Sequence, residues 1–310
     1  MNNIICLAGP TASGKTALAV ELAKELNAEI ISCDSMQIYK RMDIGTAKPT
    51  HEEMQGIPHH MIDIIEPDEP FSVSRYCDMA TPILEDILAR GKTAIIAGGT
   101  GLYMDSLIRG NDFADFPDTG IRRHLEEELE EVGVEPLLER LRAIDPYSAD
   151  HSMNNPRRIV RALQVYYETG ETITAHNERT QSLPPRYNPL WLGLDYEPRA
   201  VLYDRVNRRV GLMLEMGLLD EIRTLLSSGI PKKCTAMQAI GYKEFIDAMD
   251  GFGTIGEAAD LVRQSSRRYA KRQLTWFRRN KDMNWLTRTA DTTDEEILQK
   301  ARQVIFKTDK

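Results

Sequence analysis

The strongest constraint on the fold is the stretch 9–16, which fills the phosphate-loop pattern G-x-x-x-x-G-K-[ST] completely. A short apolar run at 4–8 precedes it, and leucines at helical spacing follow it over residues 17–26. Glycines let the backbone fold around an anion, and the N–H groups at the start of a helix point toward that anion. The order of strand, glycine loop and helix therefore predicts a phosphate-binding site in an α/β fold.

Two side chains of this loop suit a phosphate compound that binds together with a metal ion. Lys15 supplies a positive charge, and the hydroxyl of Thr16 is placed to ligate Mg²⁺, the one cofactor that we predict. The pattern by itself leaves open whether ATP or another phosphate compound binds. The predicted diphosphate- or nucleotide-binding residues of the loop are Gly9, Pro10, Thr11, Ala12, Ser13, Gly14, Lys15 and Thr16.

Strands and helices continue to alternate to about residue 110. Strand-like runs at 28–33 and 93–97 flank a helical segment at 71–89, an order typical of a parallel sheet. The carboxyl ends of parallel strands face the ligand crevice, so Asp34 should point toward the phosphate loop.

The strand at 93–97 ends without a carboxylate. Hydrolytic phosphate-loop enzymes usually carry an acidic residue there to organise Mg²⁺ and water, whereas this strand runs into Gly-Gly-Thr-Gly at 98–101. A motor or switch driven by a nucleoside triphosphate is therefore less favoured than an enzyme with a diphosphorylated substrate. Asp34 is then the candidate general base, and the alternative is a helix cap or turn residue.

The sequence changes character after about residue 110. Acidic and apolar helical segments over 111–186 predict a mostly helical insertion domain. We expect residues 1–110 and 187–310 to form a P-loop NTPase-like α/β core with a parallel sheet and C-terminal helices. A chain of 310 residues is long enough for two such domains.

The net charge of −8 argues against a nucleic-acid partner only if the cations are evenly spread. They are not, because residues 263–281 hold eight Lys or Arg and no acid, with aromatic residues between them. A basic stripe with interleaved aromatics is typical of a nucleic-acid-binding surface.

Two further groups of arginines lie at helical spacing. Arg205 and Arg209 are four residues apart on one helix face and suit a diphosphate, the alternative being a solvated surface pair. Arg157, Arg158 and Arg161 lie at the start of a helix within the insertion, where they suit a nucleic-acid backbone.

The sequence lacks the features of a membrane or secreted protein. No run approaches 18 apolar residues, and no basic segment followed by an apolar one opens the chain. The four cysteines stand far apart without a C-x-x-C pair, which disfavours a zinc site and a disulfide framework. We expect a cytoplasmic monomer with no membrane partner.

Several long motifs in order resemble the signature blocks of tRNA dimethylallyltransferases, in their bacterial form. The resemblance runs from residue 4 to about 286 and implies transfer of a dimethylallyl group from its diphosphate to N6 of the adenosine 3′-adjacent to the tRNA anticodon. The blocks are Gly-Pro-Thr-Ala-Ser-Gly-Lys-Thr at 9–16, Asp-Ser-Met-Gln-Ile-Tyr at 34–39, Met-Asp-Ile-Gly-Thr-Ala-Lys-Pro at 42–49, Gly-Gly-Thr-Gly-Leu-Tyr at 98–103, Asn-Pro-Arg-Arg at 155–158, Ile-Gly-Tyr at 240–242 and Lys-Arg-Gln-Leu-Thr-Trp at 271–276.

The resemblance also implies roles for individual residues. Thr11 is implied as a donor near the bridging oxygen of the diphosphate, and Lys15, Arg209 and Asp34 complete the expected catalytic set. The tRNA anticodon stem-loop and dimethylallyl diphosphate are the implied partners. The implied tRNA contacts are Asp34, Ser35, Met36, Gln37, Thr100, Arg122, Arg157, Arg158, Ile159, Val160, Arg161, Gln238, Ala239, Ile240, Gly241, Tyr242 and Lys243.

Other functions stay open on the residues alone. A small-molecule kinase of the shikimate or nucleotide type shares the phosphate loop, but it needs neither the helical insertion nor the basic stripe. A non-catalytic RNA-binding module has no use for a complete phosphate loop. A related prenyl transfer to free AMP or ADP is the third alternative, and retention of the protein on tRNA would count against it.

Overall fold

The computed structural model describes residues 3–110 and 119–307. The chain divides into two compact units, one comprising residues 1–110 with 187–310 and the other comprising residues 111–186. This division falls where the sequence changes character, although the first junction, 111–118, lies outside the described residues.

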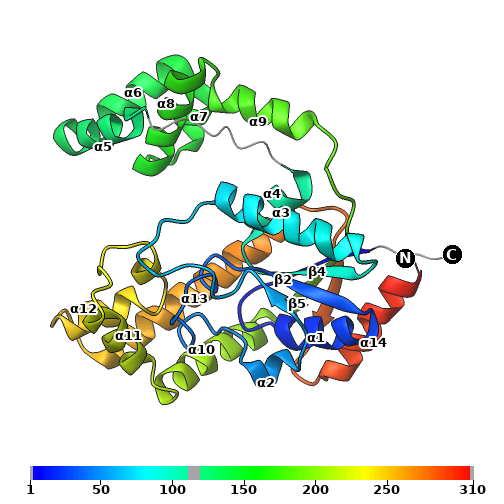
Figure 1. Cartoon of the computed structure of the whole chain (residues 1–310). Coiled ribbons are helices and arrows are strands. Elements are labelled where there is room, and N and C mark those ends of the chain that lie inside the picture. The colour runs from blue at the N-terminus through cyan, green and yellow to red at the C-terminus, as the bar shows by residue number, and fades with distance from the viewer. Residues whose placement is uncertain (1–2, 111–118, 308–310) are drawn as a thin grey trace. The chain divides into compact units, whose positions relative to one another are not determined.

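The first unit is built on a six-stranded sheet in which all paired strands run parallel (Figure 1). The strands are β1 (Ile4–Ala8), β2 (Ala28–Cys33), β3 (His59–His60), β4 (Thr93–Gly98), β5 (Leu190–Tyr196) and β6 (Asn284–Arg288). Their order is β3-β2-β4-β1-β5-β6, so β1 delivers the phosphate loop at the middle of the sheet. Every residue of β1, β2 and β5 is buried, as expected for strands covered on both faces. The predicted parallel α/β core is confirmed.

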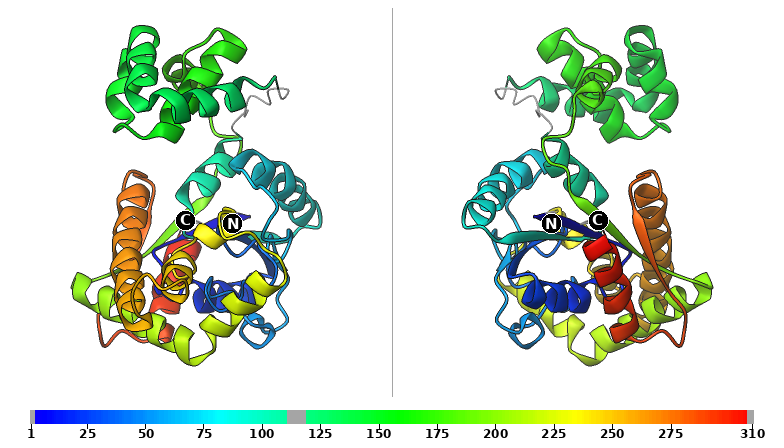
Figure 2. Two further views of the ribbon diagram at one scale, coloured as in Figure 1. Left: turned by 90° about the vertical axis from the view of Figure 1, so that its left-hand side faces the viewer. Right: turned by 90° about the vertical axis from the view of Figure 1, so that its right-hand side faces the viewer.

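Helices cover both faces of this sheet. Those of the first unit are α1 (Lys15–Glu25), α2 (His51–Met54), α3 (Val73–Ala89), α4 (Gly101–Arg109), α10 (Arg199–Glu215), α11 (Leu218–Ser227), α12 (Lys243–Met249), α13 (Ile255–Phe277) and α14 (Asp294–Lys307). Helices α1 and α14 lie side by side on one face, and α3 and α4 lie on the other (Figures 1 and 2). The core beneath α1 and α14 takes alternate strand residues, including Ile5 and Leu7 of β1 and Leu192 and Leu194 of β5.

A second core of the same unit holds the segment that follows β2. Ile38, Tyr39 and Met42 are fully buried among residues of α10, α11, α12 and α13. Phe245 of α12 and Ile222 of α11 are members of the same cluster. The loop after β2 therefore rests on helices that come more than 150 residues later in the chain, and these helices fix its course.

The second unit is helical within its described residues, as predicted. Its helices are α5 (Ile121–Val132), α6 (Val134–Ile144), α7 (Pro146–His151), α8 (Pro156–Thr169) and α9 (Ile173–Ser182). They enclose a small core of their own, in which Leu125, Leu141 and Leu163 are buried. Helix α8 begins where the sequence indicates, because Asn155 accepts hydrogen bonds from the first amides and Pro156 occupies the first turn.

Candidate active site

The phosphate loop leaves β1 and closes on the first turn of α1 through two left-handed backbone positions. Ala12 has φ 61° and Gly14 has φ 88°. Gly14 is also the N-cap of α1 and supplies no side-chain cap, so the first amides of the helix remain for a ligand. A Cβ on Gly9 would lie 3.1 Å from that of Leu194, which shows how closely the loop follows β5. The backbone therefore has the loop geometry that the motif predicts, and anion binding by it stays a prediction.

The ammonium group of Lys15 is held over this loop. Its Nζ donates to the carbonyl oxygen of Pro10 at 2.7 Å. Burial lowers the pKa of Lys15 to about 8, while the Asp34 carboxylate opposes the shift and the Arg209 guanidinium adds to it. Lys15 is thus close enough to both groups to respond to their charges. Two cations and one carboxylate leave a positive site, which suits an anionic ligand.

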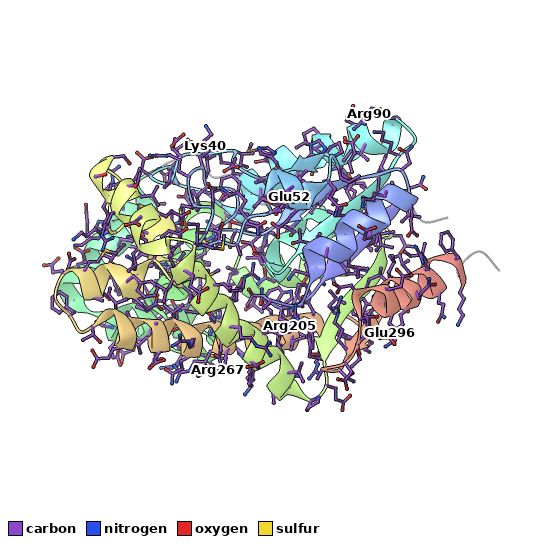
Figure 3. The ribbon with its side chains drawn as sticks, turned by 90° about the horizontal axis from the view of Figure 1, so that it is seen from below. Lys40, Glu52, Arg90, Arg205, Arg267 and Glu296 are labelled. Atoms are coloured by element: carbon purple, nitrogen blue, oxygen red, sulfur yellow. The ribbon has the colours of Figure 1, made fainter. Side chains whose placement is uncertain are left out.

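Two arginines of α10 reach the same loop. Arg205 Nε donates to the carbonyl oxygen of Ala12 at 2.9 Å, and Arg209 Nη1 donates to Thr11 Oγ1 at 3.4 Å. Arg209 also donates from Nη2 to the carbonyl oxygen of Ala47 at 3.5 Å, which ties the loop after β2 to the site. Figure 3 shows Arg205 on α10. The four-residue spacing therefore places both guanidinium groups on the phosphate loop.

Asp34 follows β2 at the same edge of the sheet. Its Oδ1 accepts a hydrogen bond from the N–H of Met36 at 2.9 Å. Thr100, which follows β4, donates its N–H to Cys33 and accepts the N–H of Ser35 on Oγ1, each at 3.1 Å. The turn role that the sequence left open for Asp34 is therefore real, but among residues 3–110 and 119–307 it engages only one carboxylate oxygen. The segments that follow β2 and β4 therefore both lie beside the phosphate loop, as expected for the carboxyl ends of parallel strands.

Three residues of α13 contribute to the site without having been predicted as site residues. Gln273 is 5% exposed; its Oε1 accepts the N–H of Thr11 at 2.9 Å and its Nε2 donates to the carbonyl oxygen of Gly99 at 3.0 Å. Tyr269 interacts with the charge of Asp34, and burial raises the pKa of its hydroxyl. Trp276 Nε1 donates to Asp105 of α4 at 2.8 Å. The sequence signal that could have indicated Gln273 and Trp276 is the uncharged stretch Gln-Leu-Thr-Trp at 273–276, which interrupts a run of cationic residues.

The basic stripe at 263–281 lies on α13 and just beyond its end at Phe277, and it is largely exposed but not uniform. Arg263 pairs with Asp260, and Arg278 pairs with Asp195 of β5. Arg267, labelled in Figure 3, donates to the side chain of Asn207. Two cations cover aromatic rings of the same helix, which explains the interleaved aromatic residues. The exposed members are Arg268, Lys271, Arg272, Arg278, Arg279 and Lys281.

The predicted RNA contacts around residue 240 divide into surface and core. Tyr242 is fully buried, and its hydroxyl donates to Glu221 Oε1 at 2.6 Å. A side chain on Gly45 would overlap the ring of Tyr242, so the two motifs pack directly together. Gly241 has φ 96°, which positions the chain before α12. Tyr242 therefore supports the loop after β2, and its side chain does not face solvent. Gln238 and Lys243 are exposed, and Ala239 and Ile240 are partly buried.

The predicted RNA contacts after β2 lie in a hydrogen-bonded turn. Gln37 donates from Nε2 to the carbonyl oxygen of Ala47 at 3.2 Å and accepts a hydrogen bond from the Ser32 hydroxyl at 3.1 Å. Ser35 and Met36 are partly buried beside it. These residues are held by local contacts and keep part of their surface open.

In the second unit, the predicted contacts also fall into two groups. Arg157 and Arg158 are exposed at the start of α8. Burial lowers the pKa of Arg161, and the nearby charge of Arg122 lowers it further, so these two arginines from α8 and α5 lie close together. Such a pair of cations suits a phosphate group. Ile159 and Val160 are 0% and 3% exposed, so their side chains pack in the core of the unit, and their predicted contact with RNA stays a prediction.

Thr16 is the residue of the loop that is predicted to ligate Mg²⁺. Thr16 lies in the first turn of α1 and is partly exposed. Within residues 3–110 and 119–307, no group of three or more His, Cys, Asp or Glu side chains could hold a metal ion. Mg²⁺ commonly takes one or two protein oxygens together with phosphate oxygens and waters. The loop therefore fits a magnesium ion that arrives with a diphosphate, and it provides no metal cage of its own.

No helix in the described part of the chain combines the length and the apolarity that crossing a bilayer requires. All four cysteines are free, and three of them are buried.

Family models match most of the chain. The model described as IPP transferase matches residues 37–280, and the model described as isopentenyl transferase matches residues 2–67. Together these matches cover the phosphate loop, the second unit and α13.

Individual relatives agree with this result. A tRNA dimethylallyltransferase from Acetivibrio thermocellus is 47% identical over 96% of both chains, and one from Halalkalibacterium halodurans is 47% identical over 96% of this chain and 94% of its own. The solved tRNA isopentenylpyrophosphate transferase of Bacillus halodurans is 43% identical, with a TM-score of 0.74 over 100% of this chain and 99% of that one. A eukaryotic dimethylallyltransferase acting on tRNA is 30% identical, with a TM-score of 0.84 over 100% of this chain and 79% of that one.

Proposed function

The chain belongs to the tRNA dimethylallyltransferase family, and on that premise we propose that it moves a dimethylallyl group from dimethylallyl diphosphate to N6 of the adenosine 3′-adjacent to a tRNA anticodon. The observation that carries the proposal is the convergence of four groups on one phosphate loop. Lys15, Arg205 and Arg209 surround the loop with positive charge, and Asp34 stands beside them at the end of β2.

The cations act on the leaving group. Negative charge builds on the diphosphate as its oxygen parts from C1 of the dimethylallyl group, so donors fixed in advance lower the barrier. The loop amides and Lys15 would bind the diphosphate on one side, and Arg205 and Arg209 on the other. The Thr11 hydroxyl, which accepts from Arg209, is suited to donate to the bridging oxygen. Thr16 would hold Mg²⁺, which would supply further positive charge to stabilise the leaving group.

Asp34 acts on the nucleophile. The lone pair of adenine N6 is delocalised into the ring, so this amino group attacks C1 well only if a base takes its proton. As the N6–C1 bond forms and the C1–O bond breaks, the N6 proton passes to Asp34 and diphosphate leaves. One oxygen of Asp34 is fixed by Met36, which leaves the other for the amino group.

The RNA must present its base outside the stack. An adenine within a stacked loop cannot reach the end of β2, so we propose that the nucleotide is flipped into the site. The exposed cations of α13, together with Arg157 and Arg158 of the second unit, would bind the RNA backbone. We further propose that the enzyme works as a cytoplasmic monomer, where its free cysteines suit a reducing compartment.

Product analysis tests the proposed function directly. The protein is incubated with labelled dimethylallyl diphosphate and unmodified tRNA, and the tRNA is digested to nucleosides. We expect the label in N6-dimethylallyl adenosine from the anticodon loop. Label on free AMP or ADP, or phosphate transfer from ATP to a small acceptor in a parallel assay, would replace the proposal with one of the other functions.

Affinity for dimethylallyl diphosphate is predicted to fall as the pH rises above about 8. Lys15 has a pKa of about 8 in the free protein, and the bound anion favours its protonated form. Below this pH Lys15 is already charged, so affinity changes little. Between pH 7 and 9 the dissociation constant should rise roughly tenfold, because one pKa unit corresponds to about 1.4 kcal/mol. Isothermal titration calorimetry at pH 7, 8 and 9 measures this dissociation constant.

The control for this titration is Lys15→Met. This variant should bind more weakly at pH 7, and its affinity should not fall further between pH 8 and 9. A wild-type protein whose affinity is constant to pH 9 would contradict the assignment of Lys15 to diphosphate binding.

Removal of exposed cations is predicted to weaken RNA binding alone. Arg157→Ala and Lys271→Ala should raise KM for tRNA and reduce the slope of log affinity against log salt by about one each. Affinity for dimethylallyl diphosphate should stay within about twofold, because the phosphate loop, Lys15 and the two arginines of α10 are unchanged. Filter binding over a range of salt concentrations provides the slope. Arg223→Ala on α11, another exposed arginine outside the proposed surface, should leave both quantities unchanged.

A further inference from the structure

Gln273 joins two loops of the site through both ends of one buried amide. Its Oε1 accepts the N–H of Thr11 at 2.9 Å, and its Nε2 donates to the carbonyl oxygen of Gly99 at 3.0 Å. A Cβ on Gly99 would overlap this amide, so the glycine makes room for it. Buried amides are stable only with their hydrogen bonds made, and both of these bonds end on the active site.

These contacts determine how Thr11 is presented. Its N–H is held by Gln273 of α13, and its hydroxyl accepts from Arg209 of α10. The peptide before Thr11 is therefore turned toward α13, while the side chain faces the arginine that is proposed to bind diphosphate. Thr11 lies in a loop with left-handed positions and no regular structure, so its orientation depends on such external contacts.

The same helix carries the proposed RNA surface. Tyr269 lies one turn before Gln273, is partly buried, and interacts with the side chains of Gln273 and Thr100. The guanidinium of Arg272 lies over the Tyr269 ring at 5.6 Å, and Lys271 is exposed beside it. Arg272 contacts Tyr269, Tyr269 contacts Gln273, and Gln273 contacts the phosphate loop. A ligand bound on the exposed side of α13 is therefore linked to the phosphate loop by side chains in direct contact.

We propose that Gln273 is a positioning residue that couples RNA docking on α13 to the orientation of Thr11 in the phosphate loop. The inference rests on the proposed function in one respect, that RNA binds the exposed cations of α13. By reciprocity, bound RNA tightens diphosphate binding by the same factor by which diphosphate tightens RNA binding. This coupling depends on the Gln273 side chain. When that side chain is replaced, RNA and diphosphate should each still bind, but neither should affect the affinity of the other.

The test measures this coupling without turnover. Inorganic diphosphate with Mg²⁺ is titrated into the full chain by calorimetry, alone and in the presence of a saturating unmodified anticodon stem-loop RNA. In the wild-type protein we expect RNA to tighten diphosphate binding at least fivefold, within the usual range of coupling. Methionine in Gln273→Met fills similar space without these hydrogen bonds. In this variant the ratio of the diphosphate dissociation constants without and with RNA should fall to about one. RNA affinity itself should change less than twofold.

Gln273→Glu supplies a rescue that packing alone would not produce. A protonated glutamic acid can accept from Thr11 and donate to Gly99, whereas the carboxylate repels the Gly99 carbonyl oxygen. Coupling in this variant should therefore recover as the pH falls from 8 to 6, while wild-type coupling changes little. Gln299→Met, the same substitution at an exposed site on α14, should keep full coupling.

Three results would overturn the inference. The first is no coupling in the wild-type protein, the second is wild-type coupling in Gln273→Met, and the third is coupling in Gln273→Glu that does not change with pH. If Gln273→Met does not fold, Tyr269→Phe removes one hydroxyl of the same chain of contacts and should halve the coupling or more. Failure of the proposed function would appear separately, as absence of prenylated RNA from the wild-type protein in the product assay.

Discussion

Replacement of Asp34 by asparagine is expected to lower kcat by about 10² to 10⁴, the usual contribution of general-base catalysis. Asparagine keeps an oxygen that can accept the Met36 N–H, so the turn after β2 is preserved. It lacks the charge that takes the N6 proton. Affinity for dimethylallyl diphosphate should stay within about threefold, because the loop, Lys15 and the arginines are untouched. Single-turnover rates at saturating tRNA and diphosphate measure the effect.

A second variant separates catalysis from the turn. Asp34→Ala removes both the charge and the acceptor, so it should lose the rate and also about 1 kcal/mol of unfolding free energy. Asp34→Asn should lose the rate and keep its melting temperature. A normal single-turnover rate in Asp34→Asn, with a lowered melting temperature, would reduce Asp34 to a structural turn residue and remove it from the mechanism.

Gly98→Ala is expected to cause the largest loss of stability of any single methyl group added at the site. Gly98 ends β4 and is paired with Cys33 of β2. A Cβ there would overlap the Cys33 carbonyl group, which is backbone and cannot move aside as a flexible side chain can. The two strands must separate, and overpacking of this kind costs about 1–3 kcal/mol or more. Thermal and denaturant unfolding give the change.

The matched control is another glycine with open space. Gly211 lies within α10, and a Cβ there would meet nothing within 4 Å. Gly211→Ala should therefore raise the unfolding free energy by about 0.5–1 kcal/mol, because alanine favours the helix. Equal changes in unfolding free energy for the two variants would contradict the explanation that close packing of β2 against β4 requires glycine at position 98.

Part of the site was predictable because its signals are local or periodic. The phosphate loop is contiguous, so eight adjacent residues and their flanks specify the cradle. The position of Arg205 and Arg209 at the loop was predictable from their four-residue spacing, which puts them on one helix face wherever that helix packs. The position of Asp34 at the same edge of the sheet was predictable because the ends of parallel strands share that edge.

Other assignments depended on packing that spacing cannot show. The residues at 157–161 look alike as a run at the start of a helix. The core of the second unit nevertheless takes Ile159 and Val160 and leaves Arg157 and Arg158 outside. Tyr242 was assigned to RNA with its neighbours, yet its ring fills the space beside Gly45. The side of a helix or loop that becomes core is set by whatever packs against it.

The sequence by itself determined the parallel α/β core and the helical character of the described part of the insertion, and it predicts a phosphate compound as the ligand of the loop. Hydrophobic periodicity, turn residues and the phosphate-loop pattern act over a few neighbouring residues, so they can be read without the fold. Tertiary structure alone decided that Gln273 reaches Thr11 across 262 positions and that Gly98 and Gly99 must lack side chains. A contact between distant segments exists only once the helices have packed on the sheet, so its geometry is absent from any local pattern.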